Sequence, residues 1–161
     1  MIIAISGTPG TGKTVVANLL GKRIDFKIVD LNSFAKKNKM VAGHDEKRDC
    51  DIVDIDDIDK HFKEIKENVV IESHFAHDIH SDVIVILRTN PKELRKRLGE
   101  REWKNEKIEE NVLSEIMEVC LSEAMETGRK TITIDTTKKT PEETVDEIIE
   151  KLDSDIAVYL K

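Results

Sequence analysis

The sequence contains little cysteine, and the two cysteines it has form no recognisable motif. Among its 161 residues only Cys50 and Cys120 are cysteines, and they do not make a C-x-x-C pair. Isolated cysteines indicate reduced thiols in a cytoplasmic protein rather than a disulfide framework. The chain is long enough to bury a core without disulfides or a structural metal. We therefore expect one domain spanning residues 1–161.

Long apolar runs are also missing. The apolar start MIIAI is too short for the core of a signal peptide. No segment approaches the roughly 20 apolar residues that a membrane span needs. We expect a soluble, cytoplasmic protein with no membrane partner.

Basic residues are outnumbered by acidic ones. Lys and Arg total 26 against 33 Asp and Glu, which gives a formal net charge of -7. Such a surface repels phosphate backbones and favours basic partners, or small ligands held by local cationic groups. Non-specific binding of nucleic acid is not expected.

What the chain does contain is an alternation of strand and helix patterns. Asn90-Pro91 and Thr140-Pro141 each combine a capping residue with a proline in the first turn, so both begin helices. This alternation predicts an α/β fold in which a five-stranded parallel sheet lies between helices. The predicted strands are the apolar, β-branched runs at residues 2–5, 27–29, 69–71, 83–87 and 131–134.

Two helices in the second half show clear apolar stripes. One is predicted to run without a break from Ile108 through Ala124 and to end at Gly128, which can adopt the left-handed cap conformation. The helix that begins at Pro141 keeps its apolar stripe as far as Tyr159. Each would cover the sheet with its apolar face.

The strongest motif is GTPGTGKT at residues 7–14, which follows a predicted strand and opens a predicted helix. It matches the P-loop pattern, in which glycines let backbone N–H groups surround phosphate oxygens. Lys13 would reach the β- and γ-phosphates of ATP, and Thr14 would offer its hydroxyl to Mg²⁺. The predicted nucleotide-binding residues here are Gly7, Gly10, Thr11, Gly12, Lys13, Thr14 and Val15.

Other P-loop classes lack their own signals in this chain. A GTPase needs N-K-x-D, but the pair Asn38-Lys39 is followed by Met40 and Val41. A transporter ATPase needs a signature loop and a longer chain. A small phosphotransferase fits best, and such an enzyme needs an acceptor-binding insertion and a cationic lid.

The segment of residues 30–67 is longer than one crossover helix requires, so we predict that it forms the acceptor arm. Six aspartates lie between Asp49 and Asp59. The absence of glycine among them excludes an EF-hand calcium loop. The alternative is a solvated loop followed by the acidic first turn of a helix.

The predicted lid covers residues 99–108 and is rich in basic side chains. Arg101, at the end of a predicted helix, is the candidate for contacting the transferred phosphoryl group. Arg88 follows the fourth strand at the ligand-binding edge of the sheet, where the alternative is a surface ion pair. The basic residues near the lid are Arg95, Lys96, Arg97, Arg101 and Lys104.

The stretch VVIESHFAHDIH ends another strand with an acid and three histidines. Glu72 should emerge beside Thr14 and hold Mg²⁺ directly or through water. His74 could accept or relay a proton near the γ-phosphate. A zinc site made of His74, His77 and His80 is a weaker alternative, since it has no sulfur ligand.

With these motifs in place, the chain resembles the atypical adenylate kinases of archaea and eukaryotic nuclei, the isoenzyme-six type. The resemblance covers nearly the whole chain. It rests on ISGTPGTGKT, GHDEKRDCDIVDIDDI, VVIESHF and VIVILRTNPKELRKRLGEREWKNEKIEENV. The family implies Mg²⁺-dependent phosphoryl transfer from ATP to AMP and other nucleoside monophosphates, slower ATP hydrolysis, and a function in maturation of the small ribosomal subunit.

Within this resemblance Lys13, Thr14, Glu72, His74 and Arg101 match the family's functional positions. Glu72 stands where the family usually has Asp, and Glu102-Trp103 replaces a small-then-aromatic pair. A basic ribosomal protein of the small subunit is the expected macromolecular partner. Two alternatives remain open, namely an assembly ATPase with incidental kinase activity and a kinase for a small metabolite.

Overall fold

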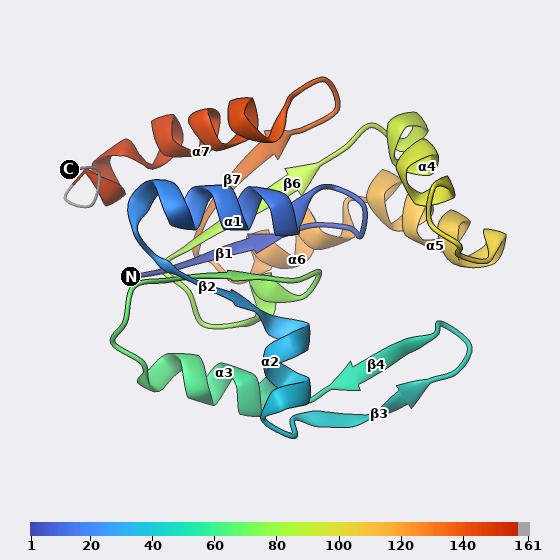
Figure 1. Ribbon diagram of the computed structural model, residues 1–161, viewed down its shortest axis with the longest axis horizontal. Coiled ribbons are helices and arrows are strands. Elements are labelled where there is room, and N and C mark those ends of the chain that lie inside the picture. The colour runs from blue at the N-terminus through green and yellow to red at the C-terminus, as the bar shows by residue number, and fades with distance from the viewer. Residues whose placement is uncertain (158–161) are drawn as a thin grey trace.

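The computed structural model describes the backbone of residues 1–157 and the side chains of that range except residues 153–156. Its centre is a parallel sheet with the strand order β2-β5-β1-β6-β7 (Figure 1). The five predicted strands are confirmed, each longer by one or two residues than the apolar pattern indicated. They are β1 (Ile2–Ser6), β2 (Lys27–Asp30), β5 (Val69–Glu72), β6 (Val83–Arg88) and β7 (Lys130–Asp135).

Helices cover both faces of this sheet, as predicted. Alternate side chains of β1 enter opposite cores, with Ile3 and Ile5 on one face and Ile2 and Ala4 on the other. The first face packs against α1 (Lys13–Ile24) and α7 (Pro141–Ile156). The second packs against α2 (Leu31–Lys37), α3 (Ile55–Glu64), the short 3₁₀ helix η1 (Ala76–Asp78) and α6 (Val119–Glu126).

Strand register brings the polar strand ends together at one edge of the sheet. Glu72, the last residue of β5, pairs with Ile5 of β1 on one side and with Asp30 of β2 on the other. The P-loop leaves β1 just beyond this point. Ligands of parallel α/β sheets bind at the carboxyl ends of the strands.

Two helices beside this edge form a separate small core. In α4 (Pro91–Gly99) and α5 (Asn105–Ile116) the side chains of Leu94, Leu98, Ile108 and Val112 are buried together. The predicted start of α4 is confirmed, because the Asn90 side chain accepts a hydrogen bond from the Lys92 N–H at 2.9 Å. The segment 100–104 connects the two helices.

The start of α7 is confirmed by a reciprocal cap. The Glu143 N–H donates to Thr140 Oγ1 at 3.1 Å, and the Thr140 N–H donates to Glu143 Oε2 at 2.7 Å. Val145, Ile148 and Leu152 are buried on the predicted stripe. Tyr159 lies outside the described residues.

The single long helix predicted from Ile108 to Gly128 is wrong, because the chain bends between α5 and α6. Glu118 adopts a left-handed conformation with φ 56° at the bend. Its carboxylate pairs with Arg88 Nη1 at 3.0 Å, and Arg88 Nε also bonds the buried Glu115. These ionic contacts stabilise a turn that helical periodicity alone does not reveal. Gly128 does follow α6 with φ 70°, as expected.

The segment of residues 30–67 leaves the sheet and returns to it. It contains α2, an antiparallel hairpin of β3 (Val41–Asp45) and β4 (Cys50–Val53), and α3. Figure 1 shows this hairpin extending from the body below α4 and α5. None of the helices in the described part of the chain is long and apolar enough to cross a membrane.

Candidate active site

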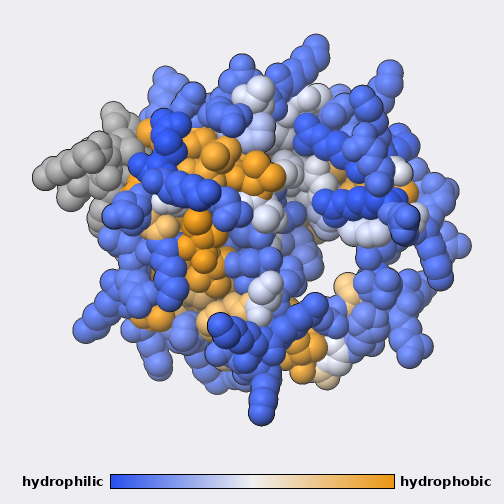
Figure 2. Space-filling model, viewed as in Figure 1, coloured by the Kyte–Doolittle hydropathy of each residue, from blue (hydrophilic) through white to orange (hydrophobic). Residues whose placement is uncertain are grey.

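A pocket of about 760 Å³ lies between the P-loop, the carboxyl edge of the sheet, the hairpin and α5. Figure 2 shows the hollow rimmed by hydrophilic residues. Most of the predicted site residues line it, whereas Gly7 and Thr11 do not. Those on its wall are Gly10, Gly12, Lys13, Thr14, Val15, Glu72, His74 and Arg101.

The P-loop backbone depends on glycine at two tightly packed positions. Gly7 has φ 149°, and a Cβ there would approach Leu87 O to 2.6 Å. Gly10 has φ 92°, and a Cβ there would lie 2.8 Å from Leu98 and 2.9 Å from Leu94 of α4. Close packing therefore holds the P-loop against α4, the helix that leads into the predicted lid.

Thr11 is buried behind the P-loop rather than in the pocket. Its hydroxyl donates a hydrogen bond to Thr8 O at 2.8 Å. The side chain thus closes the loop on itself. The predicted binding function of Thr11 would have to use its backbone.

Lys13 extends from the start of α1 toward the pocket, and Nζ donates to Thr8 O at 3.1 Å. Desolvation lowers the pKa of Lys13 to about 8, while the Glu72 carboxylate opposes this effect and Arg101 adds to it. A partly desolvated ammonium beside an open P-loop has free capacity to donate to phosphate oxygens.

Thr14 and Glu72 meet in front of the P-loop. Thr14 Oγ1 donates to Glu72 Oε1 at 3.0 Å, and Asp30 lines the same wall. Burial raises the pKa of Glu72, with a second contribution from the negative charge of Asp30. A hydroxyl and two carboxylates are the oxygen ligands that Mg²⁺ prefers, and bound Mg²⁺ would also remove this carboxylate repulsion. The donor set therefore fits Mg²⁺.

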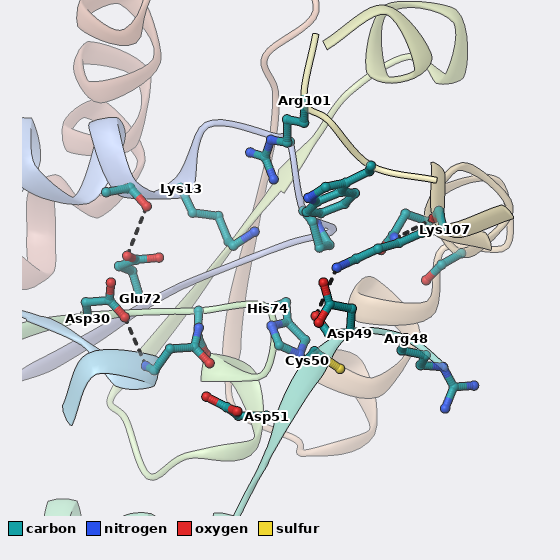
Figure 3. A pocket seen from close by; sticks show the side chains of 18 of the residues that line it. Lys13, Asp30, Arg48, Asp49, Cys50, Asp51, Glu72, His74, Arg101 and Lys107 are labelled. Atoms are coloured by element: carbon teal, nitrogen blue, oxygen red, sulfur yellow. Dashed lines mark hydrogen bonds between the residues drawn. The ribbon is translucent and has the colours of Figure 1, made fainter. Parts of the chain in front are cut away.

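His74 follows Glu72 by two residues and faces the same pocket (Figure 3). The residue as a whole keeps an exposed surface. Desolvation by the surrounding protein, with the positive charge of Lys13, lowers the pKa of His74 to about 4. The ring is therefore neutral at pH 7 and can accept a hydrogen bond.

Of the basic residues predicted near the lid, only Arg101 lines the pocket. Figure 3 shows its guanidinium directed into the pocket on the side of Lys13. Arg95 instead forms a two-pronged pair with Glu109 of α5 at 2.8 and 3.1 Å. Arg97 pairs with Glu93 and donates to Thr136 O. Arg88 does not line the pocket but forms ion pairs with Glu115 and Glu118, and the pair with Glu115 is buried rather than on the surface as the alternative had it.

The segment predicted to be the acceptor arm supplies the wall opposite the P-loop, but its individual residues were not among the predicted site residues. His44 and Asp51 face each other across the hairpin with Nδ1 and Oδ1 3.1 Å apart, and Lys36 of α2 pairs with the same aspartate at 3.3 Å. Asp51 raises the pKa of His44. No motif marks these residues, because the pairing of His44 with Asp51 depends on a strand register that the sequence does not specify.

The aspartates at residues 49–59 have several different environments. Asp49 and Asp51 line the pocket. Asp54 caps α3 by accepting from the Asp57 N–H at 3.1 Å, while Asp56 and Asp57 lie in the first helical turn. The helix-start interpretation therefore holds for Asp54, Asp56 and Asp57. Asp59 instead accepts a hydrogen bond from the His80 N–H at 2.7 Å.

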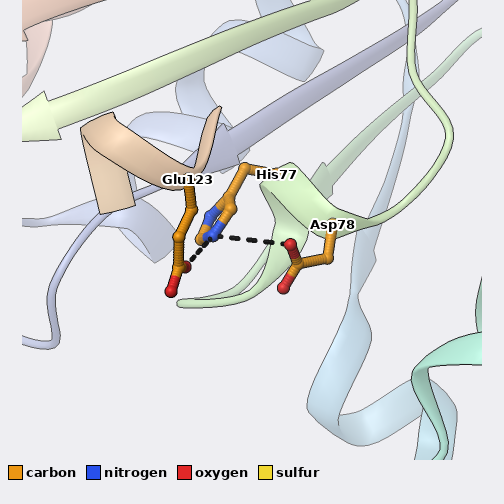
Figure 4. Close-up of side chains that lie close together, drawn as sticks. All are labelled: His77, Asp78 and Glu123. Carbon is orange, nitrogen blue, oxygen red and sulfur yellow. Dashed lines mark hydrogen bonds and ion pairs between the residues drawn. The ribbon is translucent and has the colours of Figure 1, made fainter. Parts of the chain in front are cut away.

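The histidines do not gather into the predicted zinc alternative. His77 is buried, and its ring nitrogens lie 2.7 Å from Ser6 Oγ and 2.7 Å from Glu123 Oε2. Figure 4 shows His77 beside Asp78 and Glu123. Neither His74 nor His80 belongs to this group. The hydrogen bonds of His77 join η1 to β1 and α6.

Comparison with known proteins agrees with this geometry. A family model described as an AAA domain matches residues 3–118. A protein of Pyrococcus furiosus named "Putative adenylate kinase" is 41% identical over 161 residues, covering 97% of this chain and 86% of the relative. One of the same name from Methanocaldococcus jannaschii is 38% identical, covering 94% of this chain and 86% of the relative. The chain belongs to this P-loop kinase family.

Solved structures share the fold of this kinase at low sequence identity. Shikimate kinase from Aquifex aeolicus has a TM-score of 0.61 at 18% identity, covering 96% of this chain and 98% of that one. The YorR protein of Bacillus subtilis, solved with phosphorylated GDP, has a TM-score of 0.67 at 21% identity, covering 96% and 97%. These similarities support the α/β P-loop architecture.

Proposed function

We propose that this protein is a nucleoside monophosphate kinase that reversibly transfers the γ-phosphoryl group of ATP to AMP and other nucleoside monophosphates. The observation that carries the proposal is one continuous pocket with a P-loop at one end and a polar hairpin wall at the other. The pocket volume is about 760 Å³, and its lining includes both the P-loop and the hairpin. The names of the relatives supply the acceptor class.

In this reaction the bond between the γ-phosphorus and the β–γ bridging oxygen breaks as a phosphate oxygen of the acceptor bonds to the γ-phosphorus. ADP leaves with the electron pair of the broken bond. The acceptor phosphate needs no general base, because its oxygen is already ionised at neutral pH. The chain's task is to position both phosphates and to stabilise charge.

Different residues would position the phosphates and stabilise the charge. Lys13 and the P-loop backbone would bind the ATP phosphates, and Arg101 would contact the equatorial oxygens of the transferred group. Thr14 and Glu72, with Asp30 nearby, would hold Mg²⁺. When bound, Mg²⁺ neutralises phosphate charge.

The same site accounts for slower ATP hydrolysis as a proposed second activity. Water must lose a proton during attack, unlike a phosphate acceptor. The neutral imidazole of His74 faces the pocket and can accept a hydrogen bond from that water. A base with a pKa of about 4 is weak at neutral pH, which supports hydrolysis being slower than transfer.

We further propose a cytoplasmic function in maturation of the small ribosomal subunit, with a basic ribosomal protein as partner. The family resemblance supplies the ribosomal context. The net charge of -7 favours a cationic partner over RNA. If the protein is an assembly ATPase, ATP hydrolysis would drive release of this partner, and kinase activity would be incidental.

One experiment separates these possibilities. ATP and Mg²⁺ are supplied with a panel of nucleoside monophosphates, with shikimate and gluconate as metabolite controls, and both diphosphate and free phosphate are followed. Diphosphate that appears only with a monophosphate supports the kinase. Phosphate release that rises only with purified small-subunit proteins supports the assembly ATPase, and turnover only with a metabolite overturns both.

A further inference from the structure

Trp103, the only tryptophan in the sequence, lies between two cationic side chains of the predicted lid. Arg101 Cζ is 4.9 Å from the centre of its ring, and Lys107 Nζ is 4.1 Å from it. The indole is half-buried and packs on the core shared by α4 and α5. Both cations are within the range of a cation–π interaction, which is strongest with tryptophan.

The side chain of Arg101 has an aromatic partner where the neighbouring arginines have carboxylate partners. Arg88, Arg95 and Arg97 each have a carboxylate partner. Among the described residues, no carboxylate forms an ion pair with Arg101. Its backbone N–H donates to Leu98 O at 3.1 Å, which fixes the main chain and leaves the side chain to the indole.

Lys107 connects the same ring to the opposite side of the pocket. Its Nζ donates a hydrogen bond to Asp49 O at 3.3 Å, in the turn of the hairpin. A second contact joins the hairpin turn to α5, because Arg48 Nε donates to Glu110 Oε1 at 2.8 Å. Figure 3 shows Lys107 reaching Asp49 across the pocket. Contacts therefore run from the hairpin through Lys107 and Trp103 to Arg101.

We propose that Trp103 is a positioning residue that holds Arg101 over the P-loop, and that Lys107 links this placement to the position of the hairpin. The proposal rests on the proposed function, since the hairpin wall would hold the acceptor. An acceptor that favours the hairpin position described here, in which Lys107 bonds Asp49 O, would also favour the placed state of Arg101. The transition-state arginine would then be in place mainly when an acceptor is present.

This arrangement also predicts a specific fluorescence signal. The indole contacts both cations directly, so a change in either contact alters its surroundings. Binding of a monophosphate should change the emission of Trp103 through Lys107. Binding of ATP should change it through Arg101.

A double-mutant cycle tests the proposed connection between Trp103 and Arg101. We expect Trp103→Leu to lower kcat on the order of 10²-fold, with a much smaller change in the KM for ATP, because a misplaced catalytic group costs about this much. Trp103→Phe should recover most of the loss. Arg101→Met with Trp103→Leu should be no slower than Arg101→Met alone.

Multiplicative losses in the double variant, or equal losses for Trp103→Leu and Trp103→Phe, would overturn the proposal. Thermal melting of each variant checks folding. If Trp103→Leu does not fold, the cycle is run with Trp103→Phe, whose smaller loss should disappear in the Arg101→Met background if the ring acts through Arg101. If the wild type makes no diphosphate, the proposed function fails, and the cycle is then measured on ATP hydrolysis.

The connection to the hairpin is tested with Lys107→Met and the matched control Lys92→Met. Lys92 is exposed on α4 and does not line the pocket. We expect Lys107→Met to abolish the emission change caused by AMP, to keep the change caused by ATP, and to reduce the ratio of transfer to hydrolysis. An unchanged response to AMP in Lys107→Met would show that the hairpin and Arg101 are independent.

Discussion

The Thr14 hydroxyl donates a hydrogen bond of 3.0 Å to the carboxylate of Glu72, 58 residues further along the chain. Parallel strand register creates this contact, because it sets the end of β5 beside the P-loop strand. Glu72 is buried, and Asp30 adds negative charge next to it. A divalent cation that takes these oxygens would relieve the repulsion between the two carboxylates.

We expect Glu72→Gln to raise the Mg²⁺ concentration needed for half-maximal activity by about 10–100-fold, a range typical for groups that support a metal. The amide keeps the size of the side chain but removes its charge. Magnesium titration of initial rates measures the change. Glu67→Gln is the control, since Glu67 is exposed and pairs with Lys27 away from the pocket. An unaltered Mg²⁺ requirement in Glu72→Gln would remove this residue from the metal site.

Lys13→Ala should lower kcat by on the order of 10²–10³-fold while leaving the melting temperature close to that of the wild type. The ammonium contacts Thr8 O in the P-loop but is not part of the apolar core. Steady-state kinetics and thermal melting of the same preparation test both parts. A folded variant with near-normal turnover would contradict the assignment.

Activity should depend on pH through Lys13, whose pKa is lowered to about 8, chiefly by desolvation. The ammonium form binds phosphate and is present below that pH, so kcat/KM for ATP should fall about tenfold per pH unit above it. Bound phosphate favours the protonated form, which moves the fall in kcat to higher pH. Lys13→Arg should remove the alkaline fall, because arginine stays protonated throughout this range.

Arg101→Ala should reduce kcat by about 10³-fold and change ATP affinity much less, because a lid arginine acts mainly on the transition state. Single-turnover rates and equilibrium ATP binding separate the two effects. Arg95→Ala is the matched control, since Arg95 pairs with Glu109 outside the pocket. Loss of ATP binding at unchanged turnover would make Arg101 a ground-state contact.

Arg88→Met should lower the free energy of unfolding by about 3–5 kcal/mol, because it leaves the buried carboxylate of Glu115 without its cation. Glu115 is 2% exposed. Denaturant unfolding measures the loss. Combining Arg88→Met with Glu115→Leu should recover much of it, since no buried charge then remains unpaired.

Local signals in the sequence predicted the strands, the P-loop and two helix starts correctly. Strands such as Ile2–Ser6 are almost wholly apolar, and buried parallel strands have this composition. The caps at Asn90 and Thr140 join residues at most three positions apart, so the local sequence is enough to predict them. The position of Glu72 beside Thr14 also followed from the fold class, because parallel strands end at one edge.

Contacts between distant segments could not be predicted in the same way. The bend at Glu118 is stabilised by Arg88, which lies 30 positions earlier in the sequence, and the apolar periodicity continues through it. The wall containing His44, Arg48 and Lys107 requires the hairpin to reach α5. Single surface charges give no local sign of such contacts.

Tight packing joins Gly10 of the P-loop to Leu94 and Leu98 of α4. It fixes α4 to the P-loop, and the shared core with Ile108 and Val112 fixes α5 to α4. The hairpin touches α5 only through exposed polar groups in the contacts described here. Apolar packing therefore holds the P-loop, α4 and α5 together, and we expect the hairpin to be the part that shifts when an acceptor binds. Exchange of the acceptor would then leave the P-loop contacts in place.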